Sequence, residues 1–258
     1  SMQGTDRVAE VAREADEAIK ANKDKQSLLV FRSAPDEQFA VPLNQVERIE
    51  KIKRADIETV GGKQVIQYRG GSLPLFAIDQ VAQVKPQADK EDLLVIVFVL
   101  AGREIGLLAI GPVDALEVSA EIDGSTLKQP GIMGSAIIGD HTTLLVDVFG
   151  LVQTLNPEWF AEHQVVQTTH GKAPTILYAE DSNFFRNQVK SFMQDQGYSV
   201  IEAEDGLIAW NLLQEHAGAI SLVVTDIEMP NLDGFELTAK IRNDSRFAEL
   251  PIIAVTSI

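Results

Sequence analysis

The last third of the chain alternates strand-like and helix-like segments, and this alternation limits the fold more than any other feature. After Pro174 the successive segments are TILYAE, FFRNQVKSFMQDQ, SVIEA, GLIAWNLLQEH, SLVVTD, FELTAKIRND and PIIAVTS. Strands that are separated by helices of this length run parallel to one another in one sheet. We therefore predict an α/β, doubly wound (flavodoxin-like) domain over residues 174–258.

Acidic residues follow the predicted strands at the edge where ligands bind in open α/β sheets. The β-forming run VVTD ends in Asp226, and the segment IEMPNLDG that follows contains turn-forming residues that stop a strand. Glu180 and Asp181 end the first strand, and Thr256 ends the fourth. Crowded carboxylates repel one another, and Mg²⁺ relieves that repulsion. The cluster predicts a Mg²⁺ site where a carboxylate could accept a phosphoryl group.

Taken in order, YAEDS, EDG, TDIEMPNLDG and PIIAVTS resemble the motifs of the response-regulator receiver domain. The resemblance implies that Asp226 is the phospho-acceptor. It also implies that Glu180, Asp181, Asp226 and the backbone carbonyl of Glu228 hold Mg²⁺, and that the Thr256 hydroxyl reports the phosphoryl group. The Glu-Asp pair departs from the commoner Asp-Asp pair by one methylene, with the same charge.

A plainer interpretation exists for each of these residues. Asp226 could cap a turn, Glu180 and Asp181 could cap the following helix, and Thr256 could be an ordinary strand residue. We expect Arg186, one turn into that helix, to be a solvated side chain.

Receivers continue beyond their fourth strand, and the family's phosphate-neutralising lysine lies on that later part. The sequence ends at Ile258, so no residue is assigned to this role. We therefore expect a receiver truncated after its fourth strand, with an apolar sheet edge.

The preceding part of the chain is rich in short β-forming runs separated by Gly, Pro and Asp, which predicts an all-β barrel or sandwich. Its phrases FAVPLNQVERIEKI, VIQYRGGSLPLFAID and PGIMGSAIIGDHTTLLVDVFGLV resemble the CheW-like domain. The resemblance covers residues 26–155. It implies a double β-barrel without catalytic activity that couples chemoreceptors to a histidine kinase.

Two further segments complete the predicted organisation. Residues 1–25 contain the amphipathic pattern DRVAEVAREADEAIKANK, which predicts one helix. Residues 156–173 are polar and rich in turn formers, as in a linker, with Trp159 and Phe160 anchoring the first part.

The composition limits which binding partners and which cellular compartment we expect. The net charge of −16 argues against nucleic acid and against an anionic membrane surface. The chain has no cysteine and no apolar run near the roughly 20 residues that span a bilayer, so we expect a cytoplasmic protein without membrane insertion. The expected partners are a histidine kinase or its phosphotransfer domain, CheW-like proteins and chemoreceptors.

The order of the two domains leaves several functions open. We favour the C-terminal regulatory part of a hybrid CheA-type histidine kinase, and a CheV-type adaptor without a kinase is the alternative. The sequence contains no ATP-binding or histidine phosphotransfer motif, so we expect no enzyme activity from this chain itself. A haloacid-type Mg²⁺-dependent phosphatase is disfavoured because Glu228 stands where such enzymes carry a second aspartate. A structural scaffold with a degenerate receiver remains a third possibility.

Overall fold

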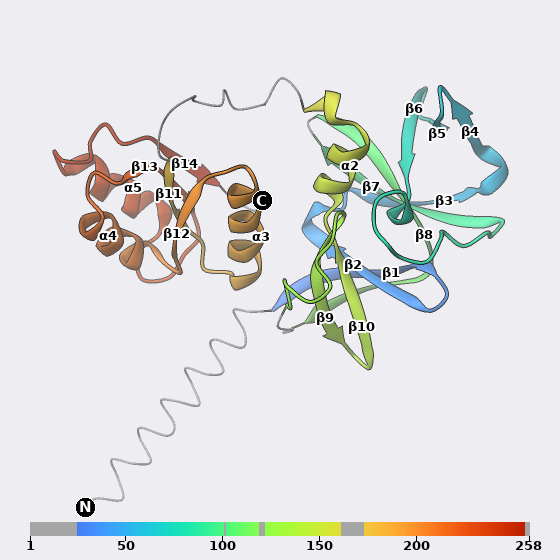
Figure 1. Ribbon diagram of the computed structural model, residues 1–258, viewed down its shortest axis with the longest axis horizontal. Coiled ribbons are helices and arrows are strands. Elements are labelled where there is room, and N and C mark those ends of the chain that lie inside the picture. The colour runs from blue at the N-terminus through green and yellow to red at the C-terminus, as the bar shows by residue number, and fades with distance from the viewer. Residues whose placement is uncertain (1–24, 101, 119–121, 161–172, 256–258) are drawn as a thin grey trace, which may run out of the picture. The chain divides into compact units, whose positions relative to one another are not determined.

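The computed structural model describes residues 25–100, 102–118, 122–160 and 173–255, apart from the side chain of Phe184. These residues form two compact units, a β-rich unit (residues 25–160) and an α/β unit (residues 173–255), which Figure 1 shows with their elements labelled. The predicted N-terminal helix lies outside the described residues, as do residues 161–172 of the predicted linker.

The β-rich unit contains ten strands that are linked into one sheet. Its main path runs in the order β4-β5-β6-β8-β1-β2-β10-β9, while β7 pairs with β8 and with β3. The strands are β1 (Gln26–Ala34), β2 (Glu37–Pro42), β3 (Arg48–Lys53), β4 (Ile57–Val60), β5 (Lys63–Tyr68), β6 (Gly71–Phe76), β7 (Asp92–Leu100), β8 (Arg103–Val118), β9 (Ile132–Ile138) and β10 (His141–Val146).

The strands of this unit enclose two separate hydrophobic cores, as the double-barrel prediction requires. β7 serves both, because alternate side chains of a strand point to opposite faces. Ile96 and Phe98 lie in one core, while Leu93, Val95 and Val97 lie in the other. Burial on both faces explains why the sequence of β7 is apolar throughout rather than alternating.

β8 connects the two halves of the β-rich unit. EIGLLAI and ALEVSA are separate runs in the sequence, yet the structure contains one strand of 16 residues. β8 pairs with β7 as far as Ala109 and with β1 from Ile110 onward. Pro112 lies at the point where β8 changes partner, and the β1–β8 register shifts there. A strand tolerates proline at such an irregularity.

A short helix closes the β-rich unit. α2 (Val148–Leu155) begins at Asp147, whose carboxylate accepts a hydrogen bond from the Gly150 N–H (2.9 Å). Beyond it, Phe160 is buried in the larger core, and the Trp159 ring packs edge-on against Phe76. The expectation that these two aromatic residues anchor the chain is therefore confirmed.

The α/β unit is a parallel sheet of four strands in the order β12-β11-β13-β14, and the prediction of alternating strands and helices is confirmed. Its elements are β11 (Thr175–Ala179), α3 (Asn183–Asp195), β12 (Ser199–Ala203), α4 (Gly206–Glu215), β13 (Ile220–Asp226), α5 (Gly234–Asn243) and β14 (Ile252–Val255).

Helices cover both faces of this sheet (Figure 1). α4 and α5 pack on one face, where Leu213 and Leu237 meet Val223 of the central strand. α3 packs on the other face, where Val189 and Met193 contact a smaller cluster of strand residues. On β14, Ile253 and Val255 are about half exposed, at 52% and 49%, as expected of an apolar sheet edge.

In the described residues, no helix is both long and apolar enough to cross a membrane.

Candidate metal centre

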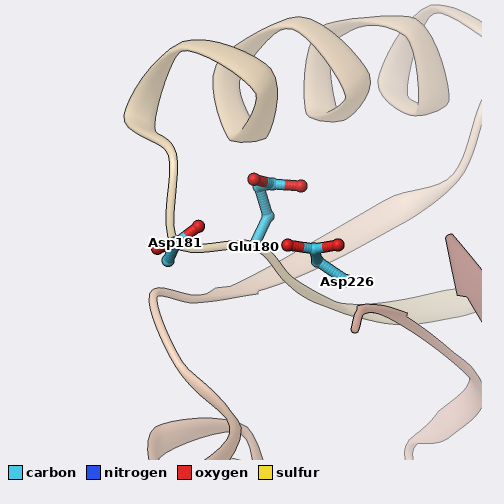
Figure 2. Close-up of side chains that lie close together, drawn as sticks. All are labelled: Glu180, Asp181 and Asp226. Carbon is cyan, nitrogen blue, oxygen red and sulfur yellow. The ribbon is translucent and has the colours of Figure 1, made fainter. Parts of the chain in front are cut away.

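Three carboxylates meet at the carboxyl ends of β11 and β13. Glu180, Asp181 and Asp226 each offer an oxygen that lies within 4.8 Å of the oxygens offered by the other two, and all three side chains are half-buried. Figure 2 shows them together, with Glu180 pointing toward α3. The structure therefore brings together three acids that are far apart in the sequence. Oxygen ligands in this number suit a hard divalent cation such as Mg²⁺.

The loop after β13 fixes the position of Asp226. The Asp226 Oδ1 accepts a hydrogen bond from the Ile227 N–H (2.7 Å), and the buried Thr225 hydroxyl donates to the Asp226 carbonyl (2.9 Å). The Gly234 N–H donates to the Ile227 carbonyl (3.0 Å), which closes the loop. A Cβ on Gly234 would lie only 2.1 Å from the Asp226 carbonyl oxygen. Glycine is therefore required at 234 for α5 to begin against the strand end.

Glu180 is held through both carboxylate oxygens. Its Oε1 accepts a hydrogen bond from the Ser182 N–H (3.2 Å), and its Oε2 accepts one from the buried Tyr178 hydroxyl (3.3 Å). Its backbone N–H donates to the Ala203 carbonyl at the end of β12 (3.0 Å). The longer acid of the Glu-Asp pair is thus fixed at its backbone and at its carboxylate.

Burial and mutual repulsion favour the protonated forms of Glu180 and Asp226. Burial, followed by repulsion from Asp226, raises the pKa of Glu180 to about 7. Burial also raises the pKa of Asp226, together with repulsion from Asp181, although the Ile227 N–H opposes this change. A bound cation would reverse this effect, because it stabilises the ionised carboxylates.

Arg186 is not the solvated residue that the sequence suggested, so that expectation is wrong. Its side chain is only 11% exposed. Its Nη1 donates to the carbonyl oxygens of Glu180 (2.6 Å) and Asp181 (3.3 Å). Only its helical position, six residues after Glu180, could have indicated that its side chain reaches back to the acid pair.

A second polar contact ties the loop after β13 to α4. Asn231 has a positive φ of 65°, and its Nδ2 donates to the Asp205 Oδ2 (2.6 Å). Asp205 also caps α4 by accepting from the Ile208 N–H (2.7 Å). The sequence analysis did not single out Asn231, although asparagine is common in left-handed turns.

The plainer interpretation of the acid pair as helix caps is not supported, because Ser182 is the N-cap of α3 and accepts from the Phe185 N–H (3.4 Å). The Glu228 side chain is exposed, and its charge also raises the pKa of Asp226. Thr256 lies outside the described residues, so its switch role stays a prediction.

Comparisons with known proteins agree with this arrangement. The family model of the CheW-like domain matches residues 27–156, which is half of the chain, and that of the response regulator receiver domain matches residues 176–258. The described sheet of four parallel strands corresponds to the second match.

Relatives with similar sequences align with one or both parts of this chain. Sensor histidine kinase CheAY of Helicobacter pylori is 28% identical over 242 residues, which cover 90% of this chain and 30% of that protein. Chemotaxis protein CheV3 of the same organism is 25% identical over 216 residues, covering 75% of this chain and 68% of that protein. Chemotaxis protein CheY1 of that organism is 40% identical over 83 residues, covering 32% of this chain and 66% of that protein. The chain thus spans less than a third of the length of the kinase.

Proposed function

Since this chain belongs to the CheW-like domain family and also contains a response regulator receiver domain, we propose that Asp226 accepts a phosphoryl group in chemotaxis signalling. The observation that carries the proposal is the meeting of Glu180, Asp181 and Asp226 within 4.8 Å at the carboxyl edge of the parallel sheet. Asp226 is the nucleophile in this proposal, because the loop after β13 holds it at the strand end.

The proposed reaction is a transfer to a carboxylate oxygen. An ionised oxygen of Asp226 forms a bond to phosphorus, while the bond between phosphorus and the donor breaks and the donor atom keeps that electron pair. The product is an acyl phosphate. The donor is a phosphohistidine of a histidine kinase or of its phosphotransfer domain.

Receiver domains generally bind Mg²⁺ for phosphorylation. The residues present fit this ion, because three carboxylates supply the oxygen ligands that it prefers. In our proposal Glu180, Asp181, Asp226 and the backbone carbonyl of Glu228 hold it. When bound, Mg²⁺ neutralises charge on the transferring phosphoryl oxygens. The Thr256 hydroxyl then reports the phosphoryl group to the neighbouring surface.

The β-rich unit supplies the docking function in this proposal. CheW-like domains act with chemotaxis kinases and receptors in general, so we infer that residues 26–155 bind a CheW-like protein and a chemoreceptor. The net charge of −16 favours protein partners over nucleic acid. These partners imply a cytoplasmic location.

Two assemblies are consistent with the order of domains. The alignment over 90% of this chain favours the C-terminal regulatory part of a hybrid CheA-type kinase. The match to a CheV-type protein, over 68% of its length, supports an adaptor without a kinase. Incubation of the natural full-length protein with ATP separates them, because only the kinase form labels itself on histidine.

The direct test of the site is phosphorylation of the chain by acetyl phosphate, followed by intact mass. We expect an adduct of about 80 Da that requires Mg²⁺ and is lost in Asp226→Asn. Glu215→Gln, which changes an exposed acid at the end of α4, serves as the matched control and keeps the adduct. A folded chain without any adduct would contradict the proposed function. Turnover of a generic phosphate ester that depends on Asp226 would instead favour a phosphatase.

A further inference from the structure

We propose that Arg186 is a positioning residue, which holds the backbone of the acid pair so that an oxygen of each carboxylate stays close to Asp226 before Mg²⁺ binds. The inference rests on the proposed function, and it assigns to Arg186 a role that the acidic residues alone do not reveal.

The Arg186 guanidinium donates to the backbone of the acid pair. Nη1 donates to the carbonyl oxygens of Glu180 (2.6 Å) and Asp181 (3.3 Å), and Nη2 donates to the Asn183 Oδ1. These contacts fix the peptide groups of the acid pair. An arginine can make these contacts at the same time because its donors point in several fixed directions.

The guanidinium is itself held from β12. Its Nε lies 3.8 Å from the Glu202 Oε2, and the Lys190 ammonium donates to the other oxygen of the same carboxylate. All three side chains are at most 31% exposed, so solvent screens this network only in part. Glu202 thus connects Arg186 and Lys190 of α3 to β12, the strand next to the acid pair.

The end of β12 consequently holds Glu180 at both of its peptide groups. The Glu180 N–H donates directly to the Ala203 carbonyl (3.0 Å), and the Glu180 carbonyl is reached from Glu202 through Arg186. Without Arg186 only the first connection remains.

This arrangement matters because three crowded carboxylates repel one another and would move apart when no cation is bound. Backbone contacts that resist this movement pre-organise the metal ligands. Partners that orient metal ligands in this way commonly change metal affinity by about 10- to 100-fold when they are removed. The saturating rate of phosphoryl transfer should change little, because Arg186 touches none of the reacting atoms.

The test compares the full-length chain with Arg186→Gln in two measurements. The first is binding of Mn²⁺, used as a paramagnetic substitute for Mg²⁺, without any phosphodonor. The second is the initial rate of adduct formation from acetyl phosphate as a function of Mg²⁺ concentration. We expect the half-saturating metal concentration to rise by about tenfold in both, with the saturating rate within about twofold of wild type.

Arg242→Gln is the matched control. Arg242 also lies on a helix of the α/β unit and donates to two backbone carbonyls, those of Ala248 (3.1 Å) and Leu250 (2.7 Å), which lie between α5 and β14 rather than in the acid pair. We expect its metal dependence to equal that of wild type. An equal weakening in Arg242→Gln would overturn the inference, because it would show a general loss of stability.

Two more variants separate positioning from charge and from folding. Glu202→Gln should weaken metal binding in the same direction but less, and the double variant with Arg186→Gln should be no weaker than Arg186→Gln alone. Arg186→Lys should restore binding only in part, since one ammonium cannot replace the guanidinium geometry. Full rescue by lysine, or unchanged metal binding in folded Arg186→Gln and Glu202→Gln, would overturn the inference. If wild type binds the metal and forms no adduct, the proposed function fails while the binding comparison still tests Arg186.

Discussion

At the scale of single residues, the acid site combines two opposing requirements. Asp226 must be ionised to act as a nucleophile, yet burial and the neighbouring acids raise the pKa of its carboxyl group. Burial and repulsion also raise the pKa of Glu180, to about 7. A cation bound between them would favour the ionised forms of both acids. In the proposed function the metal would therefore favour the ionised nucleophile as well as bind the phosphoryl group.

Because the folded pKa of Glu180 lies above its ordinary value of 4.5, this residue affects stability in a defined pH window. Folded Glu180 binds its proton more tightly than unfolded Glu180, so stability falls as pH rises from about 4.5 to about 7. We expect the thermal midpoint of the α/β unit to fall across this range in the presence of EDTA. Added Mg²⁺ should reduce the fall, since it binds the ionised form.

Glu180→Gln should flatten this pH dependence and stabilise the metal-free α/β unit at pH 8. The gain should be about 1–2 kcal/mol, because partial exposure screens the repulsion that the substitution removes. Glu215→Gln, at an exposed acid, controls for the general effect of lowering the negative charge. A metal-free midpoint that is equally steep in Glu180→Gln and wild type would show that another group causes the pH dependence.

At the scale of elements, the loop between β13 and α5 connects a sequence motif to the position of one side chain. Gly234→Ala would place a Cβ 2.1 Å from the Asp226 carbonyl oxygen and 2.9 Å from the Ile227 Cα, so the loop must move. We expect a loss of about 1–3 kcal/mol in stability and slower adduct formation at saturating Mg²⁺.

Gly197→Ala separates these two effects. Gly197 has a φ of 87°, so alanine is strained there, but no atom lies within 4 Å of the added Cβ, and the residue follows the far end of α3. This variant should lose stability and keep its rate of adduct formation. If Gly234→Ala kept the wild-type rate as well, the loop would not determine how Asp226 is presented.

Sequence reasoning was most successful where periodicity and turn chemistry agree. The helices and parallel strands of the α/β unit follow directly from that pattern, and Asp226 is placed by the strand that precedes it. β4 and β6 were not identified, because IETV is half polar and GSLPLF contains a glycine and a proline, although each strand pairs with β5 across a two-residue turn. Gly111-Pro112 separates two apolar runs in the sequence, and a proline normally ends a strand, whereas Pro112 lies where β8 changes partner. Arg186 was misjudged because a helical pattern does not reveal which backbone carbonyls a long side chain can reach.

At the scale of the whole molecule, the two units have separate hydrophobic cores and one tryptophan each. Trp159 packs against Phe76 in the β-rich unit, with Lys63 and Arg103 over its ring. Trp210 lies in the α/β unit, where it packs edge-on against Phe247. The chain contains two tryptophans, so fluorescence can report each unit separately.

All proposed metal ligands lie in the α/β unit, so Mg²⁺ should stabilise that unit alone. A ligand that binds only the folded form stabilises it by mass action, by about 2.7 kcal/mol at a hundredfold excess over the dissociation constant. We expect Mg²⁺ at about a hundredfold excess over its dissociation constant to shift the urea midpoint of Trp159→Phe, where Trp210 reports, and to leave that of Trp210→Phe unchanged. Asp226→Asn should reduce the first shift, since one ligand charge is lost. Equal shifts of both signals would mean that the two units unfold together, which would contradict the expectation that Mg²⁺ stabilises the α/β unit alone.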